Sequence, residues 1–250
     1  MIPSYQRAQK LKDQTLKFLS YHTWNKDVWI FVRDDDPQIE QYRKLSDDNY
    51  NVIELIDCRG IGNTHNAITT YFTEGEWICE LDDDIIDVIN NKRESLPNHS
   101  LQPMLQKMID IMEPEKITYG GFYQCDNPMF MSGNNEYTKD LRYCLGLMRL
   151  RRIDYSIVLE TNYAEDFENC ILHYIKDGAI LKNNWIAGKT KNYAEGGCDG
   201  DGRNIETEKA DKEFLASKYP DHCKLFQRKN GRWDLRLKNP KQNKCPSLTV

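Results

Sequence analysis

Three consecutive aspartates, Asp82, Asp83 and Asp84, are the residues of this chain best suited to chemistry. They directly follow the apolar run 77–81, which is typical of a buried strand, and α/β sheets bind ligands at the carboxyl ends of such strands. Alternate residues of an extended segment point the same way, so Asp82 and Asp84 can share one face. Two such carboxylates are suitable ligands for Mg²⁺ or Mn²⁺. A solvated acidic turn, as expected for residues 34–36, is the alternative.

The N-terminal residues Pro3, Ser4, Tyr5 and Arg7 form a second candidate site. A strand that stops at Pro3 offers backbone N–H groups, an aromatic ring and a guanidinium near the same sheet edge. These groups suit a nucleobase and an anionic phosphate, although an ordinary turn with a surface arginine fits them equally. The segment 60–68 also places glycines at the entrance of a helix, which favours phosphate, but its spacing matches no phosphate-binding motif.

A cluster of acids at the start of a later helix is the third candidate. Carboxylates such as Glu165, Asp166 and Glu168 stabilise the helix dipole at this position, and that is their usual role. A carboxylate at a junction between strand and helix can also act as a general base towards a hydroxyl. Asp166 is therefore the candidate catalytic residue.

The C-terminal segment is strongly basic. Residues 224–244 contain eight basic residues and one acid, which gives +7 and leaves −12 for the remainder of a chain whose net charge is −5. This asymmetry indicates a local anionic partner, and the alternation of basic and aromatic residues suits nucleic acid. A plain hairpin with a solvated face, turning at Asn230 and Gly231, is the alternative. The candidate DNA-binding residues are Arg228, Lys229, Arg232 and Trp233.

Short apolar strands alternate with helical stretches, which is the pattern of an α/β fold. We expect one domain over residues 1–222, followed by a basic C-terminal extension over residues 223–250, because no repeat or long linker divides the chain. The expected strands are 1–3, 28–32, 51–56, 77–81, 118–123 and 145–150, and the expected helices are 15–19, 63–72, 101–112 and 166–176.

Composition argues against membrane and secreted proteins. No apolar run approaches the ~18–20 residues of a spanning helix, and the N-terminus lacks the apolar core of a signal peptide. The eight cysteines include no CxxC pair, so neither a zinc ribbon nor a redox motif is indicated, and reduced thiols are expected. We therefore expect a cytoplasmic protein without a membrane partner.

Taken in order, these features resemble the GT-A glycosyltransferases. That family has a P-S-Y-N-R-A turn after the first strand, a second strand ending near the nucleotide, an R-N-containing helix, a strand ending in D-x-D and a later E-D pair. The counterparts here are 3–8, 28–33, His65-Asn66, 82–84 and Glu165-Asp166, with Gln6 in place of the usual Asn and His65 in place of the usual Arg. The resemblance covers roughly residues 1–175. It implies a GT-A (Rossmann-like) fold with a mostly parallel sheet flanked by helices.

The resemblance also implies a UDP-sugar donor and a Mn²⁺ or Mg²⁺ ion. Asp82 would contact the ribose or the metal, and Asp84 would bind the ion that bridges the two phosphates. Asp166 would take the proton of the acceptor hydroxyl if the transfer inverts configuration, and would orient the substrates if it retains it. The residues implied for donor binding are Pro3, Ser4, Tyr5, Arg7, Arg33, Asn66, Asp82 and Asp83.

Within GT-A, the chain is most similar to TET-associated phage enzymes, including the T-even β-glucosyl-hydroxymethylcytosine glucosyltransferases. This finer resemblance implies an acceptor in double-stranded DNA, either a hydroxymethylated pyrimidine or a sugar already attached to it, and the host cytoplasm as location. A glycan or protein acceptor, and a non-catalytic nucleic-acid-binding protein, are the alternatives. The segments that carry it are 15–19, 81–85, 127–131, Glu165-Asp166, Gly196-Gly197 and 202–204.

Overall fold

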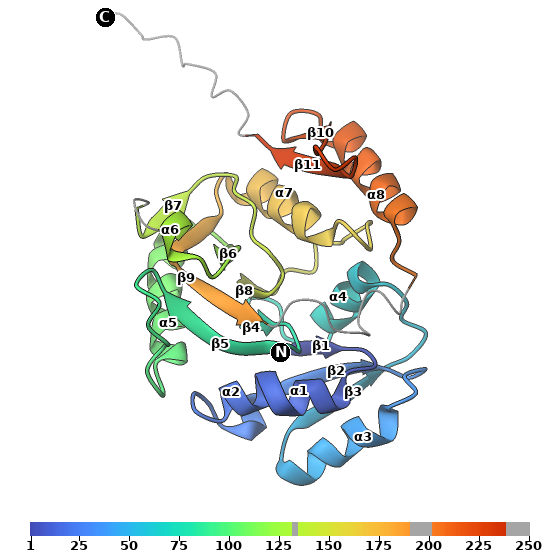
Figure 1. Cartoon of the computed structure of the whole chain (residues 1–250), viewed down its shortest axis with the longest axis vertical. Helices are drawn as coiled ribbons and strands as arrows, with labels where there is room; N and C mark the ends of the chain where they lie inside the picture. The colour runs from blue at the N-terminus through green and yellow to red at the C-terminus, as the bar shows by residue number, and fades with distance from the viewer. Residues whose placement is uncertain (132–134, 191–201, 239–250) are drawn as a thin grey trace, which may run out of the picture.

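The N-terminal part of the fold is a three-stranded parallel sheet with short helices between its strands (Figure 1). The computed structural model describes residues 1–131, 135–190 and 202–238. Parallel neighbours need a crossover connection, and here the crossovers bury Leu11, Leu16 and Tyr42 in the core. The elements in chain order are β1 (Ile2–Ser4), α1 (Ala8–Leu11), the π-helix η1 (Lys12–Leu16), α2 (Lys17–Leu19), the 3₁₀ helix η2 (Asn25–Asp27), β2 (Trp29–Arg33), α3 (Ile39–Arg43), the 3₁₀ helix η3 (Lys44–Asp48) and β3 (Asn51–Leu55).

A second sheet has six strands in the order β4-β8-β6-β9-β5, with β7 also paired to β9. Strands β6 and β9 are parallel, whereas β8 runs antiparallel to both of its neighbours. Strands β5 and β7 are antiparallel to β9. The bounds are β4 (Trp77–Leu81), β5 (Ile85–Asn90), β6 (Tyr119–Tyr123), β7 (Tyr137–Lys139), β8 (Met148–Arg152) and β9 (Leu181–Thr190).

Met1 connects the two sheets. Its amino group donates to the carbonyl of Cys79 at 2.6 Å, and the N–H of Leu81 donates to the carbonyl of Met1 at 3.0 Å. This is the bond pattern of parallel neighbours, so β1, β2 and β4 end on the same side. The predicted α/β fold is confirmed. Among the described strands, parallel pairing occurs between β1 and β2, between β2 and β3, and between β6 and β9.

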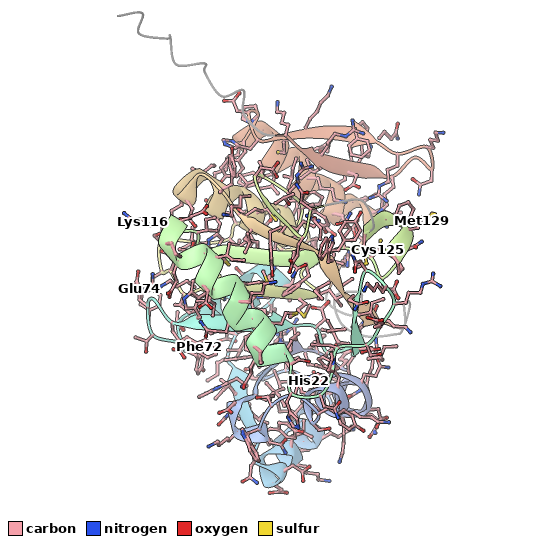
Figure 2. The ribbon with its side chains drawn as sticks, turned by 90° about the vertical axis from the view of Figure 1, so that its left-hand side faces the viewer. His22, Phe72, Glu74, Lys116, Cys125 and Met129 are labelled. Atoms are coloured by element: carbon pink, nitrogen blue, oxygen red, sulfur yellow. The ribbon has the colours of Figure 1, made fainter. Side chains whose placement is uncertain are left out.

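Helix α5 covers part of the second sheet. A Cβ on Gly120 of β6 would lie 3.1 Å from both Met108 Cε and Met112 Sδ, so the glycine permits this close packing. Figure 2 shows α5 running from near His22 to just before Lys116. In the described part of the chain, no helix has the length and apolarity needed to cross a membrane. The remaining elements before residue 180 are α4 (Ile61–Thr69), α5 (Leu101–Met112), the 3₁₀ helix η4 (Glu113–Glu115), α6 (Pro128–Met131) and α7 (Glu165–Asp177).

A helix and a hairpin complete the described chain and lie against α7 (Figure 1). Helix α8 (Ile205–Lys218) begins with a capping box, in which the Asn204 side chain accepts from the N–H groups of Glu206 and Thr207. Strands β10 (Cys223–Gln227) and β11 (Trp233–Leu237) form the hairpin expected at Asn230 and Gly231. Leu215, Cys223 and Leu235 share an apolar cluster with Ile171 of α7.

The predicted boundary before residue 223 stays a prediction. Lys241 and Lys244 of the basic segment lie outside the described residues, as do Gly196, Gly197, Cys198 and Cys245. Among the described residues the cysteines are all free, namely Cys58, Cys79, Cys125, Cys144, Cys170 and Cys223.

His173 of α7 is buried in the core and makes a testable contribution to stability. Its ring stacks on Tyr119 with centroids 4.7 Å apart, and its Nδ1 forms a 2.9 Å hydrogen bond with the Thr118 hydroxyl. Burial lowers the pKa of His173 to about 3. Below pH ~6.5 the unfolded chain therefore binds a proton that the folded chain does not, and His173 lowers the unfolding free energy as the pH falls.

We expect His173→Phe, which keeps a ring against Tyr119, to remove this pH dependence. Between pH 7 and pH 5, the unfolding free energy of the variant relative to the wild type should rise by about 2 kcal/mol. Urea unfolding at both pH values measures the difference. If the variant and the wild type differ in unfolding free energy by the same amount at pH 7 and at pH 5, the fold does not hold His173 neutral.

Candidate functional site

The carboxyl ends of β1, β2 and β4 surround a cavity of about 120 Å³. Its lining includes residues from three parts of the sequence that were predicted to bind one ligand. Phe31, Ile61 and Thr64 complete the wall. The predicted donor-binding residues that line it are Pro3, Ser4, Tyr5, Arg7, Arg33, Asp82 and Asp83.

Tyr5 and Arg33 form a stacked pair at this cavity. The guanidinium carbon of Arg33 lies 4.2 Å from the centroid of the Tyr5 ring. Asp35 accepts two hydrogen bonds from Arg33, at 2.9 and 2.7 Å, and so fixes the plane of the guanidinium. A ring and a fixed guanidinium plane together offer a stacking surface for a nucleobase.

Asn66 does not line this cavity, although it was predicted to bind the donor. Its side-chain amide donates to the carbonyl of Leu159 at 2.8 Å and accepts from the N–H of Leu159 at 2.9 Å. Both polar ends of the side chain therefore hold α4 to the segment before α7.

The acidic triplet is divided among three environments. Asp83 is buried and accepts from the Ser4 hydroxyl at 2.6 Å and from Arg7 at 3.1 Å. Asp84 pairs with Lys10 at 2.8 Å. The Asp82 carboxylate has no hydrogen-bond or ion-pair partner among the described residues, and it faces the cavity. Burial and the nearby carboxylates of Asp84, Asp83 and Asp166 raise the pKa of Asp82 to about 7.

Whether a divalent cation fits this site depends on the carboxylate of Asp82. The described residues hold no preformed group of three or more metal-ligating side chains. Asp82 nevertheless supplies oxygen ligands in a place where burial and the nearby carboxylates of Asp84, Asp83 and Asp166 raise its pKa, and hard cations prefer such ligands. Asp84, whose Oδ2 pairs with Lys10, is the second carboxylate that could join it. The assignment of Asp82 and Asp84 to a Mn²⁺ or Mg²⁺ ion stays a prediction.

A second cavity of about 220 Å³ contains the candidate catalytic residue, Asp166. Asp82 lines both this cavity and the first one, so the two cavities meet at its side chain. Tyr143, Gly146 and Arg203 also line the second cavity. The structure thus brings Asp82 and Asp166, which are far apart in sequence, to one continuous site.

Asp166 is held in place by three neighbours. Arg149 donates to its Oδ1 at 3.2 Å, and the Tyr143 hydroxyl donates to its Oδ2 at 3.3 Å. A Cβ on Gly146 would lie 2.5 Å from Oδ1, so only glycine leaves room for the carboxylate. Burial raises the pKa of Asp166, while Arg149 opposes this shift.

Arg149 belongs to a buried ionic network that was not predicted. Glu80 of β4 lies between Arg149 and Arg151 of β8, pairing with the first through Oε2 and with the second through Oε1. Burial alone would raise the pKa of Glu80, but the two arginines outweigh it and hold the pKa below its usual range. Arg149 also donates to His65 Nε2 at 2.7 Å, and burial with the Arg149 charge lowers the pKa of His65 to about 3. His65 is therefore a neutral acceptor.

The sequence does contain a signal for this network. Glu80 is the only charged residue in the apolar run 77–81, and Arg149 and Arg151 alternate with apolar residues in β8. Charges inside buried strands must be paired. This pattern predicts that partners exist, but it does not say which strand carries them.

The predicted DNA-binding residues differ in whether their charges are paired within the protein. Arg228 pairs with Asp234, and Arg232 pairs with Glu208 at 2.5 Å, so these two charges are partly neutralised within the protein. Lys229 is exposed in the hairpin turn. The Nζ of Lys209 lies 5.6 Å from the centroid of the Trp233 ring.

The Glu80 network makes a prediction about stability. Glu80→Gln would leave two buried guanidinium groups opposite a neutral amide, and removing one partner of a buried ion pair costs about 3–5 kcal/mol. We expect a loss of this size in urea unfolding. Glu54→Gln is the matched control, since its ion pair with Arg43 is exposed and should contribute little. Equal small losses in both variants would contradict the central role of Glu80.

No protein-family model and no curated protein sequence matches the chain. Solved structures do match. The S. aureus TarS fragment 1–349 in complex with UDP-GlcNAc is 17% identical, with a TM-score of 0.59 over 87% of this chain and 64% of that one. The same fragment in a second structure is 18% identical, with a TM-score of 0.51 over 73% of this chain and 56% of that one. The chain thus spans less than two thirds of these neighbours, and the likeness shows that it has the predicted GT-A fold.

Proposed function

We propose that this chain is a glycosyltransferase that moves a sugar from a UDP-sugar to a hydroxyl group. The observation that carries the proposal is the position of Asp82, which lines both the cavity of Tyr5 and Arg33 and the cavity of Asp166. A donor in the first cavity would place its sugar towards Asp166. The S. aureus TarS fragment, which shares the fold, binds UDP-GlcNAc, and this supports a donor of the same class.

Donor binding would use the first cavity. The uracil would stack beside Tyr5 and Arg33, where Asp35 already fixes the guanidinium plane. Arg7 lies at the same edge and carries a positive charge that can bind a diphosphate. Its Nη1 also pairs with Asp83 Oδ1 at 3.1 Å and lies 3.7 Å from Asp84 Oδ2.

We assign the predicted Mn²⁺ or Mg²⁺ ion to Asp82 and Asp84. A divalent ion there would act as a Lewis acid that stabilises the charge on the leaving diphosphate. Asp82 offers a carboxylate that faces the cavity, and Asp84 would join it while its Oδ2 pairs with Lys10.

Asp166 would act as the general base in an inverting transfer. Its carboxylate would take the proton of the acceptor hydroxyl while the hydroxyl oxygen bonds to the anomeric carbon and UDP leaves. Burial raises the pKa of Asp166, which makes it a better proton acceptor near neutral pH. Arg149 and Tyr143 would hold it in the orientation that the transfer requires.

We further propose that the acceptor is a hydroxymethylated or already glycosylated pyrimidine in double-stranded DNA. The basic residues of α8 and the hairpin support an anionic acceptor, since Arg228 and Arg232 line a third cavity that also reaches Asp166. Phosphate contacts dominate the affinity of proteins for DNA.

The direct test mixes the protein with Mn²⁺, a panel of UDP-sugars, and hydroxymethylcytosine, glucosylated and unmodified DNA, followed by mass spectrometry of the nucleosides. We expect a sugar mass on the modified base only. Release of UDP without a mass change in DNA would overturn the DNA acceptor and leave a glycan or protein acceptor. No UDP release with any donor would overturn the enzyme and leave a nucleic-acid-binding protein.

Two kinds of variant separate donor binding from catalysis. Asp166→Asn should still bind UDP with Mn²⁺ but lose roughly 10²–10⁴-fold in turnover, the range for a lost general base. Asp82→Asn should lose the Mn²⁺-dependent part of UDP binding as well. Asp47→Asn, at an exposed aspartate that lines none of these cavities, is the matched control for both measurements.

If calorimetry finds that UDP binding responds to Mn²⁺ equally in Asp82→Asn and in the wild type, the metal assignment is wrong. If Asp166→Asn turns over at the wild-type rate, another group is the base.

A further inference from the structure

A cavity of about 600 Å³ is lined by residues of the hairpin and of the N-terminal end of α7, and its basic residues outnumber its acidic ones. Asp166 lies at one end of this cavity and also lines the smaller cavity that contains Asp82. We call the larger cavity the arginine cleft. Its basic lining residues are Arg142, Arg203, Lys212, Arg228, Arg232 and Arg236.

Two buried carboxylates organise this cleft without neutralising it. Glu208 of α8 is 4% exposed and pairs with Arg203 at 2.5 Å, Arg232 at 2.5 Å and Lys212 at 3.6 Å. Asp234 of β11 is 7% exposed and pairs with Arg228, while Lys212 lies 3.6 Å away. Four cations thus share two carboxylates, which leaves an excess of two positive charges.

Arg236 adds to this excess. Its guanidinium lies 5.0 Å from the centroid of the Phe226 ring, and no ion pair joins it to an acidic residue of the described chain. Arg142, at the opposite wall, is 54% exposed and pairs only with the partly exposed Asp140 among the described acids. A guanidinium has five N–H donors, so an arginine held by one carboxylate retains donors for an anion.

Aromatic rings accompany the cations. Tyr143 and Phe167 line the cleft and stack on each other with centroids 4.4 Å apart. Phe226 lines it beside Arg236. Rings beside guanidinium groups are the arrangement that binds single-stranded nucleotides, where bases stack while arginines contact the backbone.

From the excess charge, the retained donors and the rings, we infer that the arginine cleft is a binding subsite for backbone phosphates of the acceptor strand. This inference rests on the proposed function for the role of Asp166 and adds the residues that hold the acceptor. A nucleotide whose phosphates lie in the cleft brings its base towards Asp166, as expected if the base leaves the duplex before the transfer. Lys229 and Trp233 do not line the cleft, so the inner face of the hairpin, not its turn, is the binding surface.

The test uses a fluorescein-labelled oligothymidylate of about four nucleotides, which has phosphates and bases but no acceptor hydroxymethyl group. Anisotropy is measured over a salt series with the full chain, in the presence of UDP and Mn²⁺. The Arg142→Ala/Arg236→Ala variant removes two charges from the cleft while leaving the ion pairs of Glu208 and Asp234 intact. The Lys26→Ala/Lys92→Ala variant removes two exposed charges elsewhere and is the matched control.

We expect the cleft variant to bind the oligonucleotide about tenfold more weakly or worse, which corresponds to the removal of at least one charge-assisted hydrogen bond. Its salt dependence should be shallower by about 0.7 for each phosphate that the variant no longer binds. The control variant should match the wild type in both affinity and salt dependence. Thermal unfolding of each variant checks that the fold is intact.

The outcomes separate the subsite from the proposed function. Binding that depends on the two arginines, without sugar transfer in any assay, supports the subsite and counts against the enzyme. Transfer to DNA with no difference between the cleft and control variants overturns the subsite and leaves the enzyme in place. A wild-type chain that does not bind the oligonucleotide at low salt also overturns the subsite.

Discussion

One buried carboxylate, Glu80, fixes the positions of the groups on which the rest of the site depends. It lies in β4 opposite Arg149 of β8 and pairs with both Arg149 and Arg151, so the ion pairs hold the two strands together. Arg149 then reaches His65 of α4 and Asp166 of α7. Without an acidic partner, these arginines would be uncompensated charges inside the protein. The same interaction thus pairs the strands and places a candidate catalytic carboxylate.

The residues that line the Tyr5 cavity could be predicted because each is marked by the sequence immediately around it. Pro3, Tyr5, Arg33 and Asp82 each stand at the end of a short apolar run, and parallel strands bring their carboxyl ends to one edge. Asp166 could be predicted as a candidate because it lies in the first turn of a helix, at a junction between strand and helix where a carboxylate can act as a base.

The remaining parts depend on pairings between distant segments. The antiparallel register of β4 and β8 brings Arg149 to Glu80, which is 69 residues away, and the spacing of residues along the sequence does not predict that pairing. Asn66 was predicted to bind the donor from the resemblance alone, and its contact with Leu159 leaves no sequence signal because it uses only backbone groups of Leu159. The sequence does not reveal the ion pairs of Arg228 and Arg232, because Asp234 and Glu208 become their partners only after α8 and the hairpin fold together.

The walls of the two outer cavities come from separate stretches of the chain. All residues that line the Tyr5 cavity precede residue 84, whereas those that line the arginine cleft follow residue 123. Substitutions can therefore accumulate in one set while the other is unchanged. A lineage with this architecture can keep its nucleotide chemistry and diverge in what it modifies, because no residue lines both surfaces.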